Sequence, residues 1–196
     1  MSLKNNFIKA TEMYNTFEEN VPAYLFRGSF EMSTTEKVSI TVAARGFYEL
    51  YFNGERITRG FLSPYVSNPN HYVYYDEYEV ETKKGENVVG IVLGNGFQNN
   101  PGGYIWKFDK ADFRGAPSFA LSITRGTEQV LVSDTSFKIA QSPILFDDYR
   151  FGEHYDANFE IDGWKDIGFD DSAWENALLA DAPLGELRAA DIPPIV

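Results

Sequence analysis

Apolar residues recur at every second position over short stretches of this sequence, and turn-forming residues end most of these stretches. Within residues 36–43, for example, the alternating apolar residues are Val38, Ile40 and Val42. This period of two is typical of a strand that buries one face. No segment has an apolar stripe at helical spacing for longer than a turn or two. The pattern therefore excludes a helical bundle and predicts an all-β protein.

Turn signals separate the expected strands at intervals of roughly ten residues, which is the spacing found in β-sandwiches and jelly rolls. Asn53-Gly54 lies between two strand-like runs. This dipeptide is a strong hairpin signal because both residues tolerate a positive φ. Residues 88–93 are almost all apolar, as expected of a central strand that is covered on both faces. We predict an all-β sandwich or jelly roll.

The chain of 196 residues carries 17 basic and 29 acidic side chains, which gives a formal net charge of −12. A surface this negative repels phosphate backbones and anionic headgroups, so we predict no nucleic-acid partner and no membrane partner. No apolar run approaches the roughly 20 residues of a membrane-spanning helix. The absence of cysteine excludes disulfides, thiolate nucleophiles and cysteine metal sites. Neutral ligands, cations and basic partners remain open.

The loop formed by residues 94–106 combines amide and aromatic side chains at the end of the most apolar strand. Amides hydrogen-bond sugar hydroxyls, and aromatic rings stack on the apolar face of a pyranose. We predict that Asn95, Tyr104 and Trp106 contact a carbohydrate. In the alternative interpretation, the aromatic side chains fill the core and the amides stabilise turns.

Residues suited to catalysis or metal binding are few. The two histidines, His71 and His154, lie far apart and outside any zinc-binding motif. Paired carboxylates serve glycoside hydrolysis and calcium binding, and the sequence has three acidic clusters: Asp147-Asp148, Glu153 with Asp156, and Asp170-Asp171. Because these clusters lie in turn-like stretches, we interpret them as solvated turns and caps. We assign no catalytic residue and no metal-binding residue.

Several phrases of the sequence, taken in order, are similar to one known domain family. They occupy residues 43–54, 62–64, 72–78, 85–97, 142–145, 152–157, 163–164, 169–174 and 187–195. Together they resemble the N-terminal, non-catalytic β-sandwich of bacterial α-L-rhamnosidases of the glycoside hydrolase family 78 type. The resemblance implies a jelly roll similar to galactose-binding domains, which agrees with the strand pattern.

In that family the hydrolytic carboxylates lie on a separate (α/α)6 barrel, and nothing in these 196 residues is similar to that barrel. The resemblance therefore implies an accessory domain of a rhamnoside-cleaving hydrolase that is inactive by itself. Its implied partners are the catalytic domain of the same chain and a rhamnoside-containing carbohydrate. A free-standing carbohydrate-binding module and a small independent hydrolase are the alternatives.

Some related sandwiches bind rhamnose through a calcium ion held by an Asp-Asn pair on a strand and an Asn in the loop after the central strand. In this sequence Asn53 matches the second member of the pair, and Asn95 matches the loop residue. Phe52 stands at the position of the Asp. The carboxylate that supplies most of the binding energy for the calcium ion is therefore missing from this sequence. The resemblance thus implies that Asn53 and Asn95 bind sugar. We predict no cofactor, with calcium as the alternative.

Composition divides the chain into three parts. Residues 1–22 are polar and weakly patterned, residues 23–182 carry the expected strands, and residues 183–196 are rich in Pro and small residues. We predict an N-terminal extension, a β-sandwich accessory domain and an exit segment toward a further domain. The first seven residues contain no apolar signal region, which favours a cytoplasmic location if residue 1 is the native start.

Overall fold

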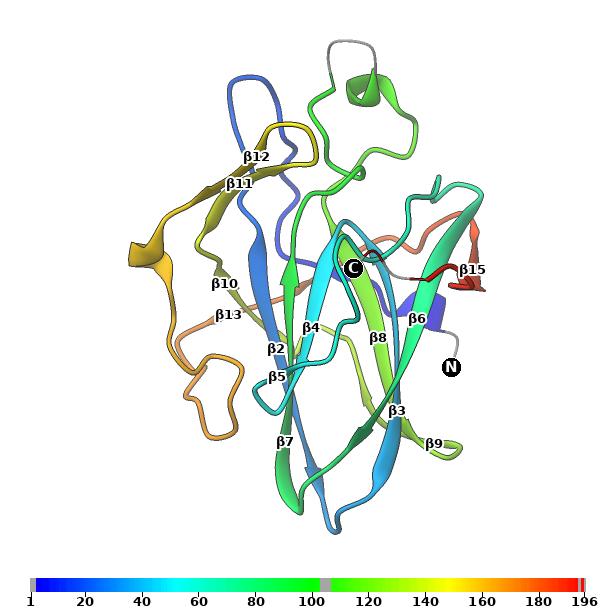
Figure 1. The fold of residues 1–196 in the computed structure, drawn as a ribbon, viewed down its shortest axis with the longest axis vertical. Coiled ribbons are helices and arrows are strands. Elements are labelled where there is room, and N and C mark those ends of the chain that lie inside the picture. The colour runs from blue at the N-terminus through cyan, green and yellow to red at the C-terminus, as the bar shows by residue number, and fades with distance from the viewer. Residues whose placement is uncertain (1–2, 103–106, 194, 196) are drawn as a thin grey trace.

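The computed structural model describes residues 3–102, 107–193 and 195. The chain forms two β-sheets that face each other, and a separate two-stranded hairpin lies beside them (Figure 1). Within the described residues the helices are the short 3-10 helices η1 (Leu3–Asn5), η2 (Phe108–Lys110) and η3 (Ala157–Phe159). None of them is long and apolar enough to cross a membrane. This architecture confirms the predicted all-β sandwich.

One layer of the sandwich is a seven-stranded sheet. Six of its strands are, in spatial order, β14 (Leu178–Leu179), β1 (Ile8–Lys9), β8 (Ser118–Arg125), β3 (Lys37–Arg45), β6 (Tyr72–Glu81) and β15 (Glu186–Ala189). The seventh strand, β9 (Glu128–Val132), pairs with β8, the strand that precedes it in the chain. The strands of this sheet are antiparallel to their neighbours, except that β15 runs parallel to β6.

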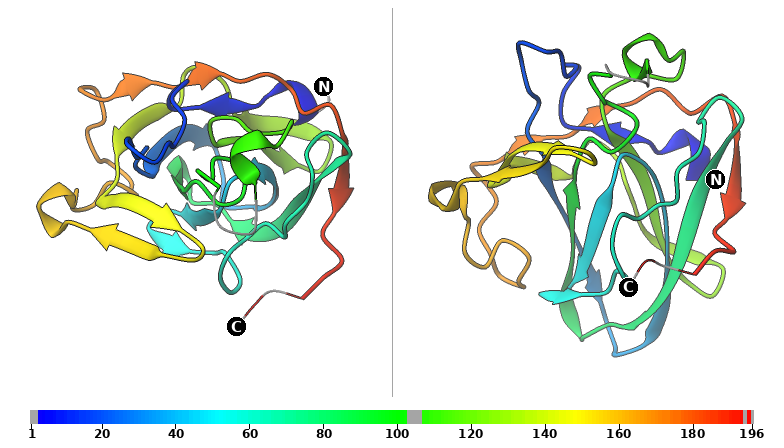
Figure 2. Two further views of the ribbon diagram at one scale, coloured as in Figure 1. Left: turned by 90° about the horizontal axis from the view of Figure 1, so that it is seen from above. Right: turned by 45° about the horizontal axis from the view of Figure 1, so that its top comes forward.

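The other layer is a six-stranded sheet, and the view from above shows it facing the first layer (Figure 2). Its strands are, in spatial order, β13 (Glu175–Asn176), β10 (Lys138–Gln141), β2 (Tyr24–Met32), β7 (Gly85–Leu93), β4 (Tyr48–Phe52) and β5 (Glu55–Arg56). The strands β11 (Ile144–Asp148) and β12 (Gly152–Tyr155) form the separate hairpin. Because β7 lies between β2 and β4, the prediction of a central strand at residues 88–93 is confirmed.

The core lies between the two sheets because alternate side chains of each strand point inward. Val38, Ile40 and Val42 of β3 are all buried, which confirms the alternation predicted for this strand. Phe26 of β2 and Phe119 of β8 meet edge to face across the core, with ring centroids 5.0 Å apart. These rings join one layer to the other, and they leave the outer faces of both sheets for other contacts.

The Asn53-Gly54 turn joins β4 to β5 as predicted. Phe52 and Glu55 pair across it, and φ is 49° at Asn53 and 91° at Gly54. Residues with a bulky side chain rarely adopt such angles, whereas Asn and Gly do so at low cost. The local turn chemistry therefore fixes the register of this hairpin.

Both flanking segments add strands to the seven-stranded sheet. In the segment 1–22, Phe7 and Ile8 are buried in the core, and β1 lies between β14 and β8. In the segment 183–196, β15 pairs with β6. The division into an extension, a sandwich and an exit segment stays a prediction, and both flanking segments take part in the sandwich.

Candidate functional site

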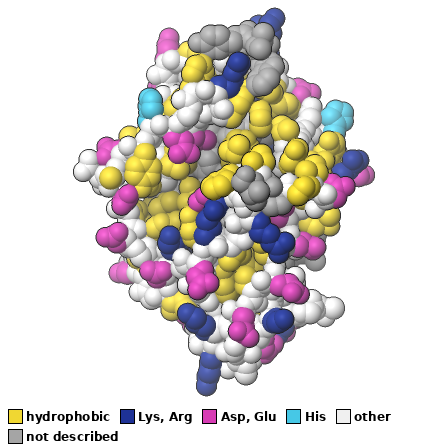
Figure 3. Space-filling model, viewed as in Figure 1, with side chains coloured by type: hydrophobic (Ala, Val, Ile, Leu, Met, Phe, Trp, Pro, Cys, Tyr) yellow, Lys and Arg dark blue, Asp and Glu magenta, His cyan; other side chains and the backbone are white. Residues whose placement is uncertain are grey.

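A cavity of about 590 Å³ lies on the outer face of the six-stranded sheet. Outward-facing side chains of β4 and β7 line its floor, and the hairpin β11–β12 and residues 160–165 line its walls. Figure 3 shows this side of the molecule, where apolar and acidic side chains lie close together. The volume falls in the range of pockets that hold small ligands.

Two aromatic rings form an apolar surface inside the cavity. Tyr51 of β4 and Trp164 meet edge to face, with ring centroids 5.7 Å apart. The ammonium nitrogen Nζ of Lys165 lies 4.4 Å from the centroid of the Tyr51 ring. Gly90 of β7 makes room for Trp164, because a Cβ atom at this residue would lie 2.7 Å from the indole. The position of the Trp164 ring therefore depends on a glycine in the central strand.

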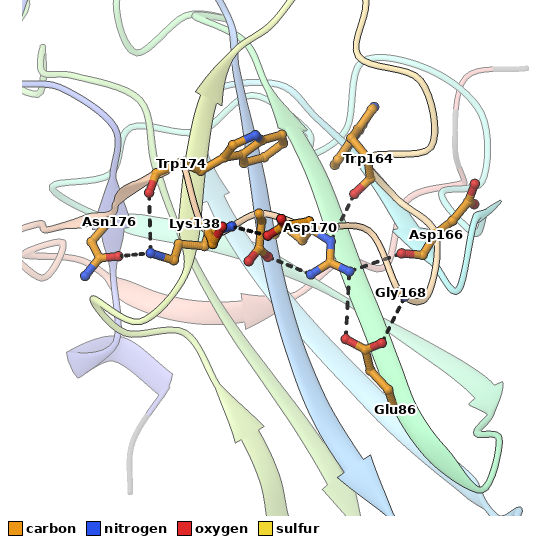
Figure 4. A network of polar contacts seen from close by, with 11 residues as sticks. Glu86, Lys138, Trp164, Asp166, Gly168, Asp170, Trp174 and Asn176 are labelled. Atoms are coloured by element: carbon orange, nitrogen blue, oxygen red, sulfur yellow. Dashed lines mark hydrogen bonds and ion pairs between the residues drawn. The ribbon is translucent and has the colours of Figure 1, made fainter.

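Arg27 of β2 holds the segment that carries Trp164 against the sheet (Figure 4). Its Nε and Nη2 atoms donate to the carbonyl oxygens of Trp164 and Asp166, each at 3.1 Å. Its Nη1 donates to Oδ2 of Asp171 at 2.6 Å, and Oε1 of Glu86 lies 3.9 Å from Nη2. The side chain is only 2% exposed, so protein groups satisfy its donors in place of water. One buried cation thus fixes a wall of the cavity.

Three carboxylates gather at the wall formed by the hairpin. Asp147 of β11 and Glu153 of β12 are direct partners in the hairpin register, and Glu49 of β4 also lines the cavity. Burial raises the pKa of Asp147, although hydrogen bonds from Asn95 and from the backbone of Gly96 act in the other direction. Glu153 is exposed on its strand, but its partial burial in the cavity wall raises its pKa, and the charges of Asp147 and Glu49 raise it further. Negative charge is therefore concentrated at this wall.

Asn95 lies behind this wall, where it is 1% exposed. Its backbone N–H and its Nδ2 donate to Oδ2 and Oδ1 of Asp147, at 2.7 and 2.6 Å. Nδ2 also donates to the carbonyl oxygen of Val21 at 2.8 Å, and Oδ1 accepts a hydrogen bond from Asn99 at 2.8 Å. The predicted site residue Asn95 thus orients the carboxylate of Asp147, which lines the cavity.

The other predicted site residues are not brought together with Asn95. Asn53 follows the last residue of β4, whereas the loop of Asn95 lies beside the first residue of that strand. The Nδ2 of Asn53 donates to Oδ1 of Asn87 at 3.0 Å, so this side chain is engaged in its turn. Tyr104 and Trp106 lie outside the described residues. One predicted residue therefore supports the cavity wall, and one lies at the opposite end of β4.

The remaining described amides of this loop stabilise the loop itself, as in the alternative interpretation. The backbone N–H of Asn15 donates to Oδ1 of Asn99 at 2.9 Å, and Nδ2 of Asn15 donates to the carbonyl oxygen of Asn99 at 2.8 Å. Nδ2 of Asn100 donates to Oδ2 of Asp148 at 2.7 Å. These bonds tie the loop after β7 to the N-terminal segment and to β11.

The acidic clusters noted in the sequence do not form one site. Asp147 and Asp148 belong to β11 rather than to a turn. Asp171 pairs with Arg27, and Oδ1 of Asp170 accepts a hydrogen bond from the backbone N–H of Ser172 at 3.0 Å, as a turn-stabilising residue does. Across residues 3–102, 107–193 and 195, no group of three or more His, Cys, Asp or Glu side chains is placed to hold a metal ion.

Sequence reasoning does not select Tyr51, Trp164 or Asp147 for the site. The sequence does contain one signal for it, since a glycine inside a strand often marks a close approach of another group. Gly90 is such a glycine. No local pattern, however, connects it to a tryptophan that follows many residues later. The cavity is a product of tertiary packing.

Replacing Glu153 by Gln is expected to stabilise the fold slightly near neutral pH. A carboxyl group whose pKa is raised in the folded state binds protons more readily there than in the unfolded chain, so its contribution to stability falls as the pH rises through that pKa. Removing the charge should raise the free energy of unfolding by roughly 0.5 kcal/mol or less at about pH 7, since solvent screens part of the repulsion.

Urea denaturation at about pH 7 and at about pH 3.5, below the ordinary pKa of glutamate, measures this effect. The gain should shrink at the lower pH, where Glu153 is protonated in both states. Glu79 of β6 is exposed and does not line the cavity, so Glu79→Gln is the matched control. A Glu153→Gln variant that is less stable than the parent chain at neutral pH would contradict the expected repulsion.

Residues 33–196 match the family model described as the alpha-L-rhamnosidase N-terminal domain. An alpha-L-rhamnosidase from Formosa agariphila is 32% identical to the chain over 184 residues, which make up 88% of this chain and 19% of that protein. The chain thus spans about a fifth of the length of this relative.

Solved rhamnosidase structures contain a domain of the same fold. The alpha-L-rhamnosidase from Dictyoglumus thermophilum superposes with a TM-score of 0.83 and 31% identity, over 98% of this chain and 23% of that one. The enzyme from Streptomyces avermitilis, solved in complex with L-rhamnose, gives a TM-score of 0.73 and 26% identity over 84% of this chain and 16% of that one. By sequence and by fold, the chain belongs to the family of α-L-rhamnosidase N-terminal domains.

Proposed function

We propose that this chain is an accessory domain of a larger α-L-rhamnosidase and that it binds a rhamnosyl sugar in the cavity between β4 and the hairpin β11–β12. The rhamnosidases that it resembles carry this region as a minor part of their length, 19% and 23% in two of them. Hydrolysis of the rhamnoside would take place in another part of such an enzyme. The same lengths favour an accessory domain over a free-standing carbohydrate-binding module.

The observation that carries the proposal is that one cavity combines an aromatic surface with hydrogen-bond acceptors. The rings of Tyr51 and Trp164 can pack against the apolar face of a pyranose. The carboxylates of Asp147 and Glu153 can accept hydrogen bonds from sugar hydroxyls, and charge-assisted bonds of this kind are stronger than neutral ones. A neutral sugar is not repelled by the acidic surface. The Streptomyces enzyme, whose structure contains L-rhamnose, suggests which sugar to test.

Asn95 keeps a positioning role in this proposal, because its two hydrogen bonds to Asp147 set the direction of that carboxylate. The predicted sugar contacts of Tyr104, Trp106 and Asn53 remain proposals, and of these residues Asn53 lies at the other end of β4. A single set of variants separates these places, since Trp164 lines the cavity and Trp174 does not, while Trp106 belongs to the loop predicted from the sequence.

The test is a titration of the chain with L-rhamnose, followed by calorimetry or by NMR chemical shifts. We expect weak binding, on the order of millimolar, because an exposed monosaccharide makes few contacts. Trp164→Ala should weaken it by roughly tenfold or more, a loss of about 1.4 kcal/mol, within the range of one aromatic contact. Trp174→Ala is the matched control, because Trp174 packs on Phe169 and does not line the cavity.

The melting temperature of each variant shows whether it is folded. Binding that survives in Trp164→Ala but is lost in Trp106→Ala would place the sugar at the loop of residues 94–106 and overturn the cavity as the site. Binding that needs added calcium would favour the calcium alternative. No binding by the folded parent chain would overturn the proposed sugar-binding function.

A further inference from the structure

We propose that the sugar in this cavity is joined to a cationic group, so that the preferred ligand is a rhamnoside with an amine next to the rhamnosyl ring. This inference rests on the proposed function and narrows the class of substrate. It is carried by the arrangement of charge at the hairpin wall and by the aromatic surface beside it.

The hairpin register holds two carboxylates directly opposite each other at the wall of the cavity. Asp147 and Glu153 are paired residues of β11 and β12, and like charges in that arrangement destabilise a two-stranded hairpin. Among the described residues, neither one forms an ion pair with Lys, Arg or His. The hydrogen bonds that Asp147 accepts come from uncharged groups, the amides of Asn95 and the backbone of Gly96. A bound cation would replace this repulsion with attraction.

The surroundings of the pair do not supply that cation. The described residues that line the cavity include six carboxylates but one ammonium, that of Lys165. Glu49 already has a partner, since its Oε1 lies 3.1 Å from Nη2 of Arg56. The raised pKa of Glu153, with burial as the main cause and the charges of Asp147 and Glu49 as further causes, agrees with an excess of negative charge. A positively charged ligand is therefore complementary to this wall.

The aromatic surface already accommodates one ammonium group. Nζ of Lys165 lies over the ring of Tyr51 at 4.4 Å from its centroid, a geometry in which the ring attracts a cation. The Lys165 side chain is anchored in the wall formed by residues 160–165, and it makes no ion pair with the hairpin carboxylates among the described residues. Because Lys165 occupies this face of Tyr51, the ammonium group of a ligand would lie at the hairpin carboxylates Asp147 and Glu153, away from the charge of Lys165.

An organic cation fits this wall better than a metal ion does. Within the part of the chain that the structure describes, no set of three or more acidic or histidine side chains is arranged as metal ligands. An ammonium group needs fewer oxygens, because it has three donors, and Asp147 and Glu153 present carboxylate oxygens from neighbouring strands. The sugar ring of the same ligand would then pack on Trp164.

The experiment compares two synthetic ligands of nearly equal size, 2-aminoethyl α-L-rhamnoside and 2-hydroxyethyl α-L-rhamnoside. Calorimetric titration at low salt and about pH 7 should give an affinity about fivefold higher for the amine, as expected of one charge pair in a partly solvated site. Glu153→Gln should reduce that preference to about twofold or less, while Glu79→Gln keeps it. Added salt should lower the affinity for the aminoethyl rhamnoside much more than the affinity for the hydroxyethyl rhamnoside.

Each outcome decides between the two proposals. If both rhamnosides bind equally well, the inference about charge is overturned and the proposed function stands. If neither binds the folded chain, both are overturned. If 2-methoxyethylamine binds as tightly as the aminoethyl rhamnoside, the cavity recognises a cation but not a sugar, and the proposed function is overturned. A preference for the amine that persists in Glu153→Gln would overturn the placement at the hairpin wall.

Discussion

Replacement of Arg27 by alanine is expected to lower the free energy of unfolding by about 3 kcal/mol, because removing one partner of a buried ion pair leaves the other charge uncompensated. The guanidinium is almost fully buried and bonds to Asp171 and to the carbonyl oxygens of Trp164 and Asp166. Water would have to enter the gap to satisfy these acceptors, and the segment that they belong to would lose its anchor on β2.

Urea denaturation of the variant and the parent chain measures this loss. Arg125→Ala is the matched control, since Arg125 also contacts two carboxylates, those of Glu36 and Glu128, but its side chain is 34% exposed. Exposed pairs of this kind contribute about 1 kcal/mol at most. Equal losses of unfolding free energy in the two variants would show that the burial of Arg27 adds nothing to the stability of the fold. Weaker rhamnose binding in Arg27→Ala is expected as well, because the same segment carries Trp164.

Replacement of Phe119 by alanine should cost about 4 kcal/mol, which is within the range for removing a buried phenyl ring. The ring is fully buried, and it meets the rings of Phe26 at 5.0 Å and Phe137 at 6.1 Å between centroids. Its removal leaves a void between the two sheets that neither layer can close, because both are held by their own backbone ladders.

The loss is again measured by urea denaturation. Phe17→Ala serves as the control because Phe17 is 75% exposed, and surface substitutions usually change stability by no more than about 0.5 kcal/mol. A smaller loss is expected for Phe119→Leu, which refills part of the space. A Phe119→Ala variant as stable as the parent chain would contradict the assignment of this ring to the centre of the core.

The elements that the sequence predicts correctly are those specified by local chemistry. The alternation of residues 36–43 sets the buried face of β3, and the Asn53-Gly54 turn sets the β4–β5 hairpin. The strands β1, β14 and β15 are only two to four residues long. Such short segments carry no measurable period, and their pairing depends on partners elsewhere in the chain. A strand this short can be assigned only when the structure of the neighbouring sheet is known.

The candidate site follows the same division. The sequence draws attention to Asn95 because amides after a central strand suit a sugar, yet its burial behind Asp147 depends on β11, which joins the loop from a distant part of the chain. Arg27 lies in a strand-like run where a charge gives no hint of a partner, and Asp171 reaches it from a later turn. The fit of Trp164 over Gly90 is likewise a match between two surfaces. Patterns in a single sequence describe residues that are neighbours along the chain. The contacts of Asn95, Arg27 and Trp164 join residues that are far apart in the chain, so such patterns do not predict them.

The position of β1 between β14 and β8 has a consequence for how the domain is made in the cell. Ile8 pairs with Phe119 on one side and with Leu179 on the other, so β1 is synthesised before both of its partner strands and is paired on both sides only after Leu179 has been synthesised as well. Until then its edges are open to other chains. Contacts of such long sequence separation slow folding. During synthesis β1 therefore gains its second partner strand only once Leu179 has emerged, and one of its edges stays unpaired until then.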